Sequence, residues 1–279
     1  MRRAALNPNN ALIGDLLSVR PNWGVSTRRL TRRYAGACMN VRRSSDNATR
    51  DIFFAGDVLD VEAIRSFAGA GGSAFVVTWY DQFASTASAL TQATTTAQPR
   101  ILNAGALEVV GKKRAPAPRG FGAQTLRAST PPFADASEIT VTHVQAEVSR
   151  GDSTAWSLNS GASRVDCSAP YATGVLLVFD VGGTSSPQRA VTTWPLAVGS
   201  NAVVTGLNSV SANTKSIRVN EAVLVTNTGT TGTNVEVQLF SGSGAFVDAT
   251  IAEMLIFSSS LLPANLQKIE TNQRLFYGI

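Results

Sequence analysis

Histidine and cysteine are scarce in this chain of 279 residues, which has one histidine and two cysteines. A structural zinc site needs four such ligands, so the composition excludes the usual zinc centres. A Ser-His-Asp device would have to use His143, and because that residue lies in a stretch with strand character we expect a structural imidazole instead. Cys38 and Cys167 exclude a disulfide framework, and we expect them to be two buried thiols.

Long apolar runs are also missing. No stretch approaches the about 20 apolar residues that a membrane span requires. Near the start, the apolar segment Ala11–Leu17 is short and contains Asp15, which is unlike a signal peptide. We therefore expect no membrane association, and folding in the reducing cytosol of a bacterial cell.

Charge is sparse and unevenly distributed. Charged residues make up 15% of the chain against 44% hydrophobic residues, a composition that favours strands and turns over amphipathic helices. Residues 1–50 contain ten Arg against Asp15 and Asp46, a net charge of +8, whereas the rest of the chain carries 14 basic and 17 acidic groups. Such a basic region could contact nucleic acid or an acidic partner. The interpretation we favour is that these arginines pair within the fold, which makes nucleic acid an unlikely partner.

The N-terminal part predicts an arm followed by a helix and a hairpin. Residues 1–24 are rich in Asn and Pro and have the character of an irregular arm. Ser26 is placed to cap a short helix over Thr27–Tyr34. Period-2 alternation in residues 37–42, a polar turn, and a returning strand over Asp51–Ala55 then predict a hairpin.

The next segment predicts a second helix and a buried strand. Asp60 is a good N-cap for a helix over Val61–Ala68, and Gly69 ends it. The apolar run Ala74–Tyr80 predicts a strand that is buried on at least one face. The Pro-rich, basic stretch 110–120 is expected to be a loop within a single domain that extends over residues 25–279.

From residue 137 onward the pattern is that of strands separated by turns of Gly, Asn and Thr, which indicates a β-sandwich. The chain then ends in a helix that begins at Pro263 and continues to about Arg274, with Gly278 beyond it. The predicted strands are Ile139–Val144, Gly174–Asp180, Ala190–Trp194, Ser216–Val225, Val235–Phe240 and Ile251–Phe257.

The C-terminal segment, FVDATIAEMLIFSSSLLPANLQKIETNQRLFYGI, resembles the end of laminin-G-like concanavalin jelly rolls. Those domains close with a strand that carries a Glu, a turn of small residues, a helix and a terminal Tyr-Gly. The stretch Ser216–Glu221 is similar to the family's strand that leads into an Asn-centred hairpin. The resemblance implies a mainly β fold, a concanavalin/laminin-G-like jelly-roll sandwich with short N-terminal helices and a C-terminal helix.

A second resemblance covers the N-terminal part. Four motifs look like the opening of the α-L-arabinofuranosidase B catalytic domain, which has a concanavalin-like sandwich of its own. Short proteins of this type without a secretion signal also resemble structural components of tailed bacteriophages. The motifs are Ser26-Thr-Arg-Arg-Leu-Thr-Arg-Arg-Tyr-Ala-Gly36, Val41-Arg-Arg-Ser-Ser-Asp46-Asn47, Thr78-Trp-Tyr-Asp-Gln82 and Leu90-Thr-Gln-Ala93.

The carboxylates that this family uses are not found at the matching positions. A retaining glycosidase needs two carboxylates about 5 Å apart. The resemblance places the nucleophile two residues after Asp180, where this chain has Gly182, and the acid/base eleven residues before Glu253, where it has Gly242. The family's disulfides, including a vicinal pair, are also absent. We therefore expect a catalytically silent, glycosidase-like fold that is not an enzyme.

The N-terminal motifs leave seven candidate binding residues. In one interpretation the aromatic pair stacks on a sugar and the polar residues bind its hydroxyls. In the other, which we favour, the aromatic pair is half-buried and Asp81 pairs with Arg42 or Arg43 to hold the hairpin on the sandwich. The seven residues are Arg42, Arg43, Asp46, Trp79, Tyr80, Asp81 and Gln82.

No cofactor is expected. A Ca²⁺ site on the sandwich loops could use Asp152, Asp166 or Asp180, but their spacing does not match a known ligand pattern.

These observations favour a bacteriophage virion protein with a structural or adhesion role, such as a decoration, collar, tail or fibre component that binds a cell-surface glycan. We expect it to contact other virion proteins through the N-terminal arm and to form a homo-oligomer. The alternatives are a glycoside hydrolase acting on arabinofuranosides and a protein that contacts nucleic acid through its basic N-terminal region.

Overall fold

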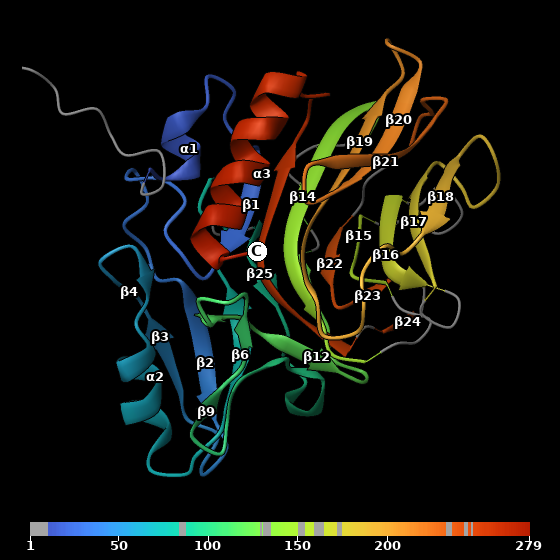
Figure 1. The fold of residues 1–279 in the computed structure, drawn as a ribbon. Coiled ribbons are helices and arrows are strands. Elements are labelled where there is room, and N and C mark those ends of the chain that lie inside the picture. Colours follow the sequence, from blue (N-terminus) through green and yellow to red (C-terminus); the bar gives the residue numbers. More distant parts are fainter. Residues whose placement is uncertain are drawn as a thin grey trace, which may run out of the picture.

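A computed structural model describes residues 11–83, 88–128, 130, 135–149, 154–158, 165–171, 175–232, 236–242, 245–246 and 248–279. The chain forms a β-sandwich of antiparallel strands, and hydrogen bonding connects the two layers into one large, nearly closed sheet (Figure 1). The prediction of a mainly β fold with short N-terminal helices and a C-terminal helix is confirmed.

The first layer is built around the long strands β14 and β25, which pair with each other over most of their length. Both are buried along almost their whole length because one face lies against the second layer and the other is covered by a helix. In spatial order the layer contains β1 (Trp23–Ser26) and β12 (Arg119–Phe121), which both pair with β25, then β25 (Asp248–Phe257), β14 (Glu138–Glu147), β19 (Asn201–Ser209), β20 (Thr214–Val219) and β21 (Ala222–Asn227).

The second layer supplies the other half of the core, including Trp156 and Phe179. Its last strand lies beside the last strand of the first layer, where the Asn227 side chain donates to the Arg189 carbonyl at 2.8 Å. In spatial order the layer contains β13 (Leu126–Ala128), β22 (Val237–Leu239), β15 (Trp156–Ser157), β16 (Val165–Tyr171), β17 (Leu176–Val181) and β18 (Arg189–Thr193).

The N-terminal strands join the two layers, because β7 pairs with β13 of the second layer and β8 pairs with β12 of the first. These strands are β2 (Met39–Arg43), β3 (Thr49–Ile52), β6 (Ala74–Trp79), β7 (Leu90–Thr91), β8 (Arg100–Asn103) and β9 (Ala106–Leu107). Three small hairpins and a 3₁₀ helix complete the described elements: β4 (Phe54–Ala55) with β5 (Val58–Leu59), β10 (Val109–Val110) with β11 (Ala115–Pro116), β23 (Ser241–Gly242) with β24 (Ala245–Phe246), and Thr95–Ala97.

Elements with strong local signals form as predicted. Helix α2 (Val61–Ala68) begins where the Asp60 carboxylate accepts a hydrogen bond from the Ala63 amide at 2.9 Å, and it ends at Gly69, whose φ is +81°. The predicted hairpin and the strand after Gly69 are present as β2, β3 and β6. Most strands predicted after residue 137 are also found, with shifted ends, but the one predicted over Ser216–Val225 is the hairpin of β20 and β21, and β16 and β19 were not predicted. Cys38 and Cys167 are buried free thiols, as expected.

The C-terminal helix α3 (Pro263–Tyr277) lies across the outer face of the first layer (Figure 1). Its Leu266 and Ile269 pack in one apolar cluster with Leu255 and Phe257 of β25. Gly278 ends the helix in the left-handed conformation, with φ +70° and ψ +47°, as the sequence predicts. Among the described residues, no helix is long and apolar enough to span a membrane.

The prediction of a helix over residues 27–34 is wrong. Ser26 ends strand β1, where it lies opposite Glu253 of β25, and its hydroxyl donates to that carboxylate at 2.9 Å instead of capping a helix. Residues 11–24 also differ from an irregular arm, because they contain helix α1 (Ile13–Leu16) and strand β1 and pack into the domain. Pairing with a strand more than 200 residues away overrides the local capping signal.

Candidate active site

Two carboxylates face each other on the second layer. Asp166 of β16 and Asp180 of β17 are direct partners in the antiparallel register, so their side chains leave the same face of the sheet. Directly opposite residues have Cβ atoms about 5 Å apart. Asp166 is 1% exposed and Asp180 is completely buried. Burying two adjacent acids is costly unless other groups compensate their charge.

Arg189 compensates Asp180. It lies directly opposite Asp180 on β18, and its Nε and one terminal nitrogen donate to the two carboxylate oxygens at 2.8 and 2.7 Å. This bidentate geometry is the strong form of a charge-assisted hydrogen bond. The Arg189 side chain is 23% exposed, so the pair extends from the buried acid toward the surface.

Asp166, Asp180 and Arg189 belong to a row of polar residues that lie opposite one another on neighbouring strands. The row continues from Asp166 in the other direction. Ser157 of β15 lies opposite Asp166, Gln238 of β22 lies opposite Ser157, and Arg127 of β13 lies opposite Gln238. The Arg127 side chain is half exposed and lies 3.9 Å from a carboxylate oxygen of Glu236. The row therefore crosses five strands and runs from an exposed ion pair to two buried acids.

Strand alternation explains why this face is polar. On β16 and β17, the residues next to the acids, Cys167 and Phe179, point to the sandwich core. Phe179 packs against Gly206 of β19, where an added Cβ would lie 2.9 Å from the ring. The acids must then point away from the first layer. In the sequence, each acid lies between apolar residues. This pattern does not show which residue of β17 lies opposite Asp166.

A lysine from the first layer binds backbone and side-chain oxygens close to Asp180. Lys215 of β20 is completely buried and donates to the carbonyls of Pro187 and Gln188 and, at 2.8 Å, to the Thr230 hydroxyl. Thr230 in turn donates to the Val181 carbonyl at 2.7 Å. Burial lowers the pKa of Lys215 to about 8, and the nearby Asp180 opposes that shift. Lys215 thus adds a second positive charge close to Asp180.

Gly182, which the family resemblance aligns with the nucleophile, has no room for a side chain. Its φ is +83°, and an added Cβ would lie 2.1 Å from the Thr231 carbonyl oxygen. The backbone of residues 228–232 passes too close for a carboxylate to stand there. Among the described residues, Asp166 and Asp180 are the two acids that lie side by side on this face.

The predicted binding residues of the N-terminal hairpin make local contacts. Arg43 forms a bidentate pair with Asp46 in the turn of the same hairpin, at 2.8 and 2.6 Å. Arg42 donates to the side chains of Gln98 at 2.7 Å and Asn47 at 2.8 Å. These contacts differ from the pairing of either arginine with Asp81 that the sequence suggested.

The other predicted residues divide between the core and the interface of β1 with β6. Trp79 is completely buried, so its ring offers no face for stacking on a sugar, and the Tyr80 hydroxyl donates to Asp51 at 2.9 Å. Asp81 accepts hydrogen bonds from the backbone amide of Gly24 at 3.0 Å and from the Ser88 hydroxyl at 2.7 Å. Gln82 accepts from the Leu30 amide at 2.7 Å and donates to the Arg28 and Ser26 carbonyls. These contacts hold the N-terminal segment on the sandwich.

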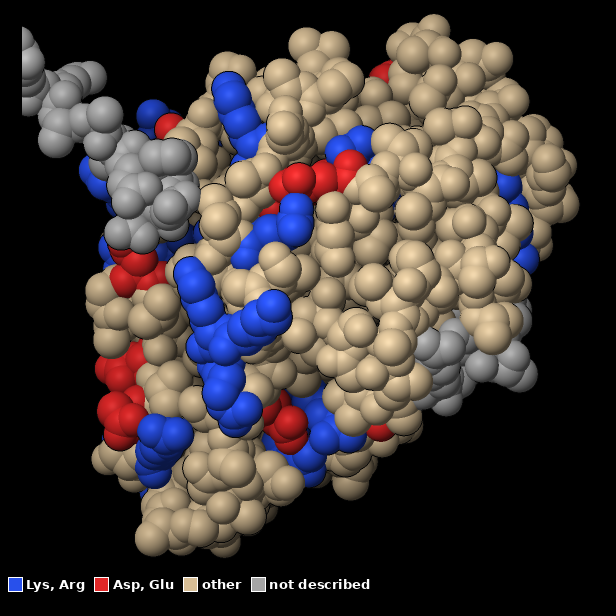
Figure 2. All heavy atoms as spheres, in the orientation of Figure 1, with Lys and Arg blue, Asp and Glu red and all other residues tan. Residues whose placement is uncertain are grey.

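Some of the N-terminal arginines have partners within the fold, whereas Arg20, Arg32, Arg33 and Arg50 are exposed, and the absence of a nucleic-acid partner stays a prediction. Arg28 is buried and paired with Glu253, and the ring of Phe83 lies under Arg20 at 5.5 Å. Figure 2 shows Lys, Arg, Asp and Glu interspersed over the N-terminal elements and α3, whereas the surface over β19, β20 and β21 is mostly uncharged on this face.

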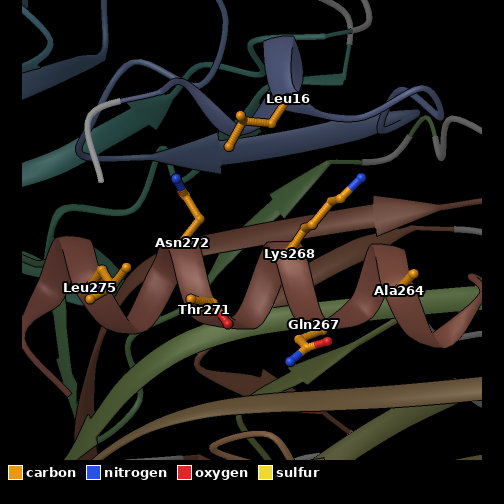
Figure 3. A pocket seen from close by; sticks show the side chains of 7 residues that line it. All are labelled: Leu16, Ala264, Gln267, Lys268, Thr271, Asn272 and Leu275. Carbon is orange, nitrogen blue, oxygen red and sulfur yellow. The ribbon is translucent and has the colours of Figure 1, made fainter. Parts of the chain in front are cut away.

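A groove of about 560 Å³ lies along the outer face of α3 but has no acid in its lining. In Figure 3, Lys268 and Asn272 point toward the segment that carries Leu16, and Gln267 points to the other side of the helix. Asn272 is already used, since its amide donates to the Ala11 carbonyl at 3.0 Å. Without a carboxylate the groove cannot perform acid–base chemistry on a glycoside.

The structure brings two of the three acids considered for Ca²⁺ together, Asp166 and Asp180, whereas Asp152 lies outside the described residues. Within the described ranges, no group of three or more His, Cys, Asp or Glu side chains is arranged to hold a metal ion.

The sequence matches no protein-family model and no curated protein. In structure, the chain is similar to GH54 α-L-arabinofuranosidases. One was soaked with a cyclic sulfate inhibitor (TM-score 0.71, 14% identity), and a mutant was soaked with 4-nitrophenyl α-L-arabinofuranoside (TM-score 0.69, 16% identity). A third is an arabinofuranosidase complexed with arabinofuranosyl-α-1,2-xylobiose (TM-score 0.66, 16% identity). Each comparison covers 97% of this chain but only 65% of the other.

These similarities place nearly the whole chain in the fold of those glycoside hydrolases. They contradict the expectation of a fold that is not an enzyme, because the structures that share this architecture over 97% of the chain are arabinofuranosidases. That expectation rested on two short sequence matches, at Gly182 and Gly242. The virion location, the virion partners, the homo-oligomeric state and the cell-surface glycan stay predictions, since none of these comparisons bears on them.

Proposed function

We propose that this chain is a glycoside hydrolase that acts on arabinofuranosides, with Asp166 and Asp180 as its working carboxylates. The observation that carries the proposal is their direct pairing on neighbouring strands. Retaining glycosidases need two carboxyl groups about 5 Å apart, and a direct cross-strand pair places the Cβ atoms that carry them at about that spacing. The structural similarity to arabinofuranosidases supports the substrate class.

The charges around the two acids suit different roles. Asp180 has Arg189 in bidentate contact and Lys215 nearby, so it suits the ionised role of nucleophile. Asp166 lies directly opposite Asp180. Because two adjacent acids cannot both carry full charge at low cost, Asp166 suits the role of acid/base, which must hold and release a proton.

Segments 150–153, 159–164 and 233–235, which adjoin strands of the second layer in sequence, lie outside the described residues. The two acids and their described partners carry the proposed chemistry.

The test is release of 4-nitrophenolate from 4-nitrophenyl α-L-arabinofuranoside by the purified chain. We expect turnover by the wild type and a loss of about 100-fold or more in D166N and D180N, since each removes a proton-transfer or nucleophilic group. The matched control is E62Q, which changes an 80% exposed carboxylate on α2 and should keep full activity. Circular dichroism would confirm that every variant is folded.

The absence of turnover by the folded wild type would overturn the proposal. Activity that survives in both D166N and D180N would place the chemistry elsewhere. Saturable binding of the substrate without cleavage would contradict hydrolysis and indicate that the chain binds glycans instead.

A further inference from the structure

A second cavity, of about 330 Å³, lies where the N-terminal, middle and C-terminal parts of the chain meet. It is far smaller than a protein-binding groove and is within the range of small-molecule sites. Its walls come from β5, α2, the β10–β11 hairpin and the end of α3. The apolar lining residues are Val58, Leu59, Val61, Ala115, Pro116 and Phe276.

The turn of the β10–β11 hairpin places positive charge at this cavity. Lys113 and Arg114 line it, and both are exposed. Lys113 donates to the Leu275 carbonyl at 2.6 Å, whereas the Arg114 side chain has no hydrogen-bond or ion-pair partner among the described residues. Arg114 has a φ of +52°, a conformation that side chains rarely adopt. Figure 2 shows Lys and Arg atoms gathered on this face near the C-terminal end of α3.

Nearby acids do not neutralise this charge. Asp57, next to Val58, lies 3.7 Å from Arg29, and Glu62, next to Val61, lies 2.7 Å from Arg65. Asp60, between Leu59 and Val61, accepts a hydrogen bond from the Ala63 amide at 2.9 Å as the cap of α2. Among the described residues, none of these three acids forms an ion pair with Lys113 or Arg114, so both cations can pair with a bound anion.

The interior offers one polar group. Thr27 lines the cavity and is 2% exposed, and its hydroxyl oxygen is buried without a hydrogen-bond partner among the described residues. Buried hydroxyls in native proteins are nearly always satisfied. An apolar pocket with cations at its mouth and an unsatisfied hydroxyl in its wall calls for a ligand with matching groups.

We propose that this cavity binds a small aromatic carboxylate that carries a hydroxyl group. The carboxylate would pair with Arg114 and Lys113, the ring would lie against the apolar wall, and the ligand hydroxyl would hydrogen-bond to Thr27. None of the lining residues belongs to the row of Asp166 and Asp180. The site is therefore independent of the proposed hydrolysis, and neither proposal depends on the other.

The test is isothermal titration of the full chain with 4-hydroxybenzoate, compared with benzoate, which lacks the hydroxyl, and 4-hydroxybenzamide, which lacks the charge. For a ligand of this size we expect a dissociation constant of about 0.1–1 mM. The amide should bind about tenfold more weakly, because it loses the charge-assisted contacts. Added salt should weaken the binding of the acid but not of the amide.

Variants assign the contacts. R114Q should weaken binding of 4-hydroxybenzoate about five- to tenfold. T27V keeps the shape of the side chain and should remove the preference for 4-hydroxybenzoate over benzoate. K268Q is the matched control, because Lys268 is an exposed cation that lines the other groove on α3.

No heat of binding up to 10 mM of any of the three compounds would overturn the proposal. So would an equal loss of affinity in R114Q and K268Q, since that pattern reflects general attraction to a basic surface. A hydroxyl preference that persists in T27V would remove Thr27 from the site.

Discussion

Glu253 and Asp180 are both completely buried carboxylates paired with an arginine, but their surroundings differ. Glu253 accepts hydrogen bonds from Arg28 at 2.6 and 3.0 Å and from three neutral donors, on β1 and on α3. The neutral donors are Ser26 at 2.9 Å, Gln273 at 3.0 Å and Tyr277 at 3.1 Å.

Asp180 is placed differently, because its arginine is partly exposed and a second acid lies opposite it. A carboxylate with a closed set of donors from several segments fixes the architecture, since it has no capacity left for a ligand. A carboxylate whose arginine reaches toward the surface and which faces another acid is arranged for chemistry. The predictions below test this distinction.

The largest effect is expected from E253Q. The replacement leaves the buried Arg28 guanidinium without a counter-charge, which should cost about 3–5 kcal/mol of unfolding free energy. Urea denaturation of E253Q and wild type would measure it, and E62Q, on an exposed α2 carboxylate, should differ from wild type by less than about 0.5 kcal/mol. A loss in E253Q as small as that in E62Q would contradict an architectural role for the pair.

His143 should dominate the pH dependence of stability between pH 6.5 and 4. Burial lowers its pKa to about 4, and Nδ1 accepts a hydrogen bond from the Trp156 indole at 3.0 Å, so the folded state holds the neutral ring. The unfolded chain takes up this proton near pH 6.5. Stability should therefore fall as pH drops from 6.5 to 4, by about 3 kcal/mol.

Glu253 also loses its contribution to stability on acidification, but at lower pH, because Arg28 and the other hydrogen-bond donors outweigh burial and lower its pKa. Its contribution is present above pH 4.5 and is lost only as pH falls further through the folded value. Urea denaturation at several pH values should show a shallower decline for H143Q than for wild type between pH 6.5 and 4. Parallel curves would contradict the neutral, buried imidazole.

D180N should be less destabilising than E253Q, with a total loss of about 2 kcal/mol of unfolding free energy. The reason is that Arg189 is partly exposed and can turn to solvent. D166N should cost less than D180N, because both variants remove the repulsion between the two acids but D180N also takes away the counter-charge of Arg189. The same two variants should both lose hydrolysis. If D166N loses activity without a matching loss of stability, Asp166 belongs to a working site. Equal losses of stability in D166N and D180N would count against that assignment.

How much of this the sequence could predict depends on the range of the interactions. Helix α2 was predictable because Asp60 and Gly69 fix its ends locally. The helix expected after Ser26 failed because that residue pairs with Glu253, and no local pattern carries that information.

The candidate site was harder to predict from the sequence than the helices were. Asp180 lies at the end of a predicted strand, whereas no strand was predicted around Asp166, and the pairing of the two acids depends on the register of β16 with β17. The family match directed attention to Gly182 instead, two residues beyond the acid that the structure places in the row. The N-terminal motifs resemble the family because they hold the segment in place, and such residues are as recognisable as reactive ones.

The smallest effect is expected from D46N, which tests those motifs directly. Asp46 lies at the surface, where its hydrogen bonds with Arg43 and with the Ala48 amide lower its pKa to about 2. Its contribution to stability is present above pH 4 and is lost as pH falls toward 2. At neutral pH we expect D46N to melt close to wild type and to release 4-nitrophenolate at the wild-type rate. A large loss of turnover in folded D46N, with activity kept in D166N, would move the working site from the second layer to the N-terminal hairpin.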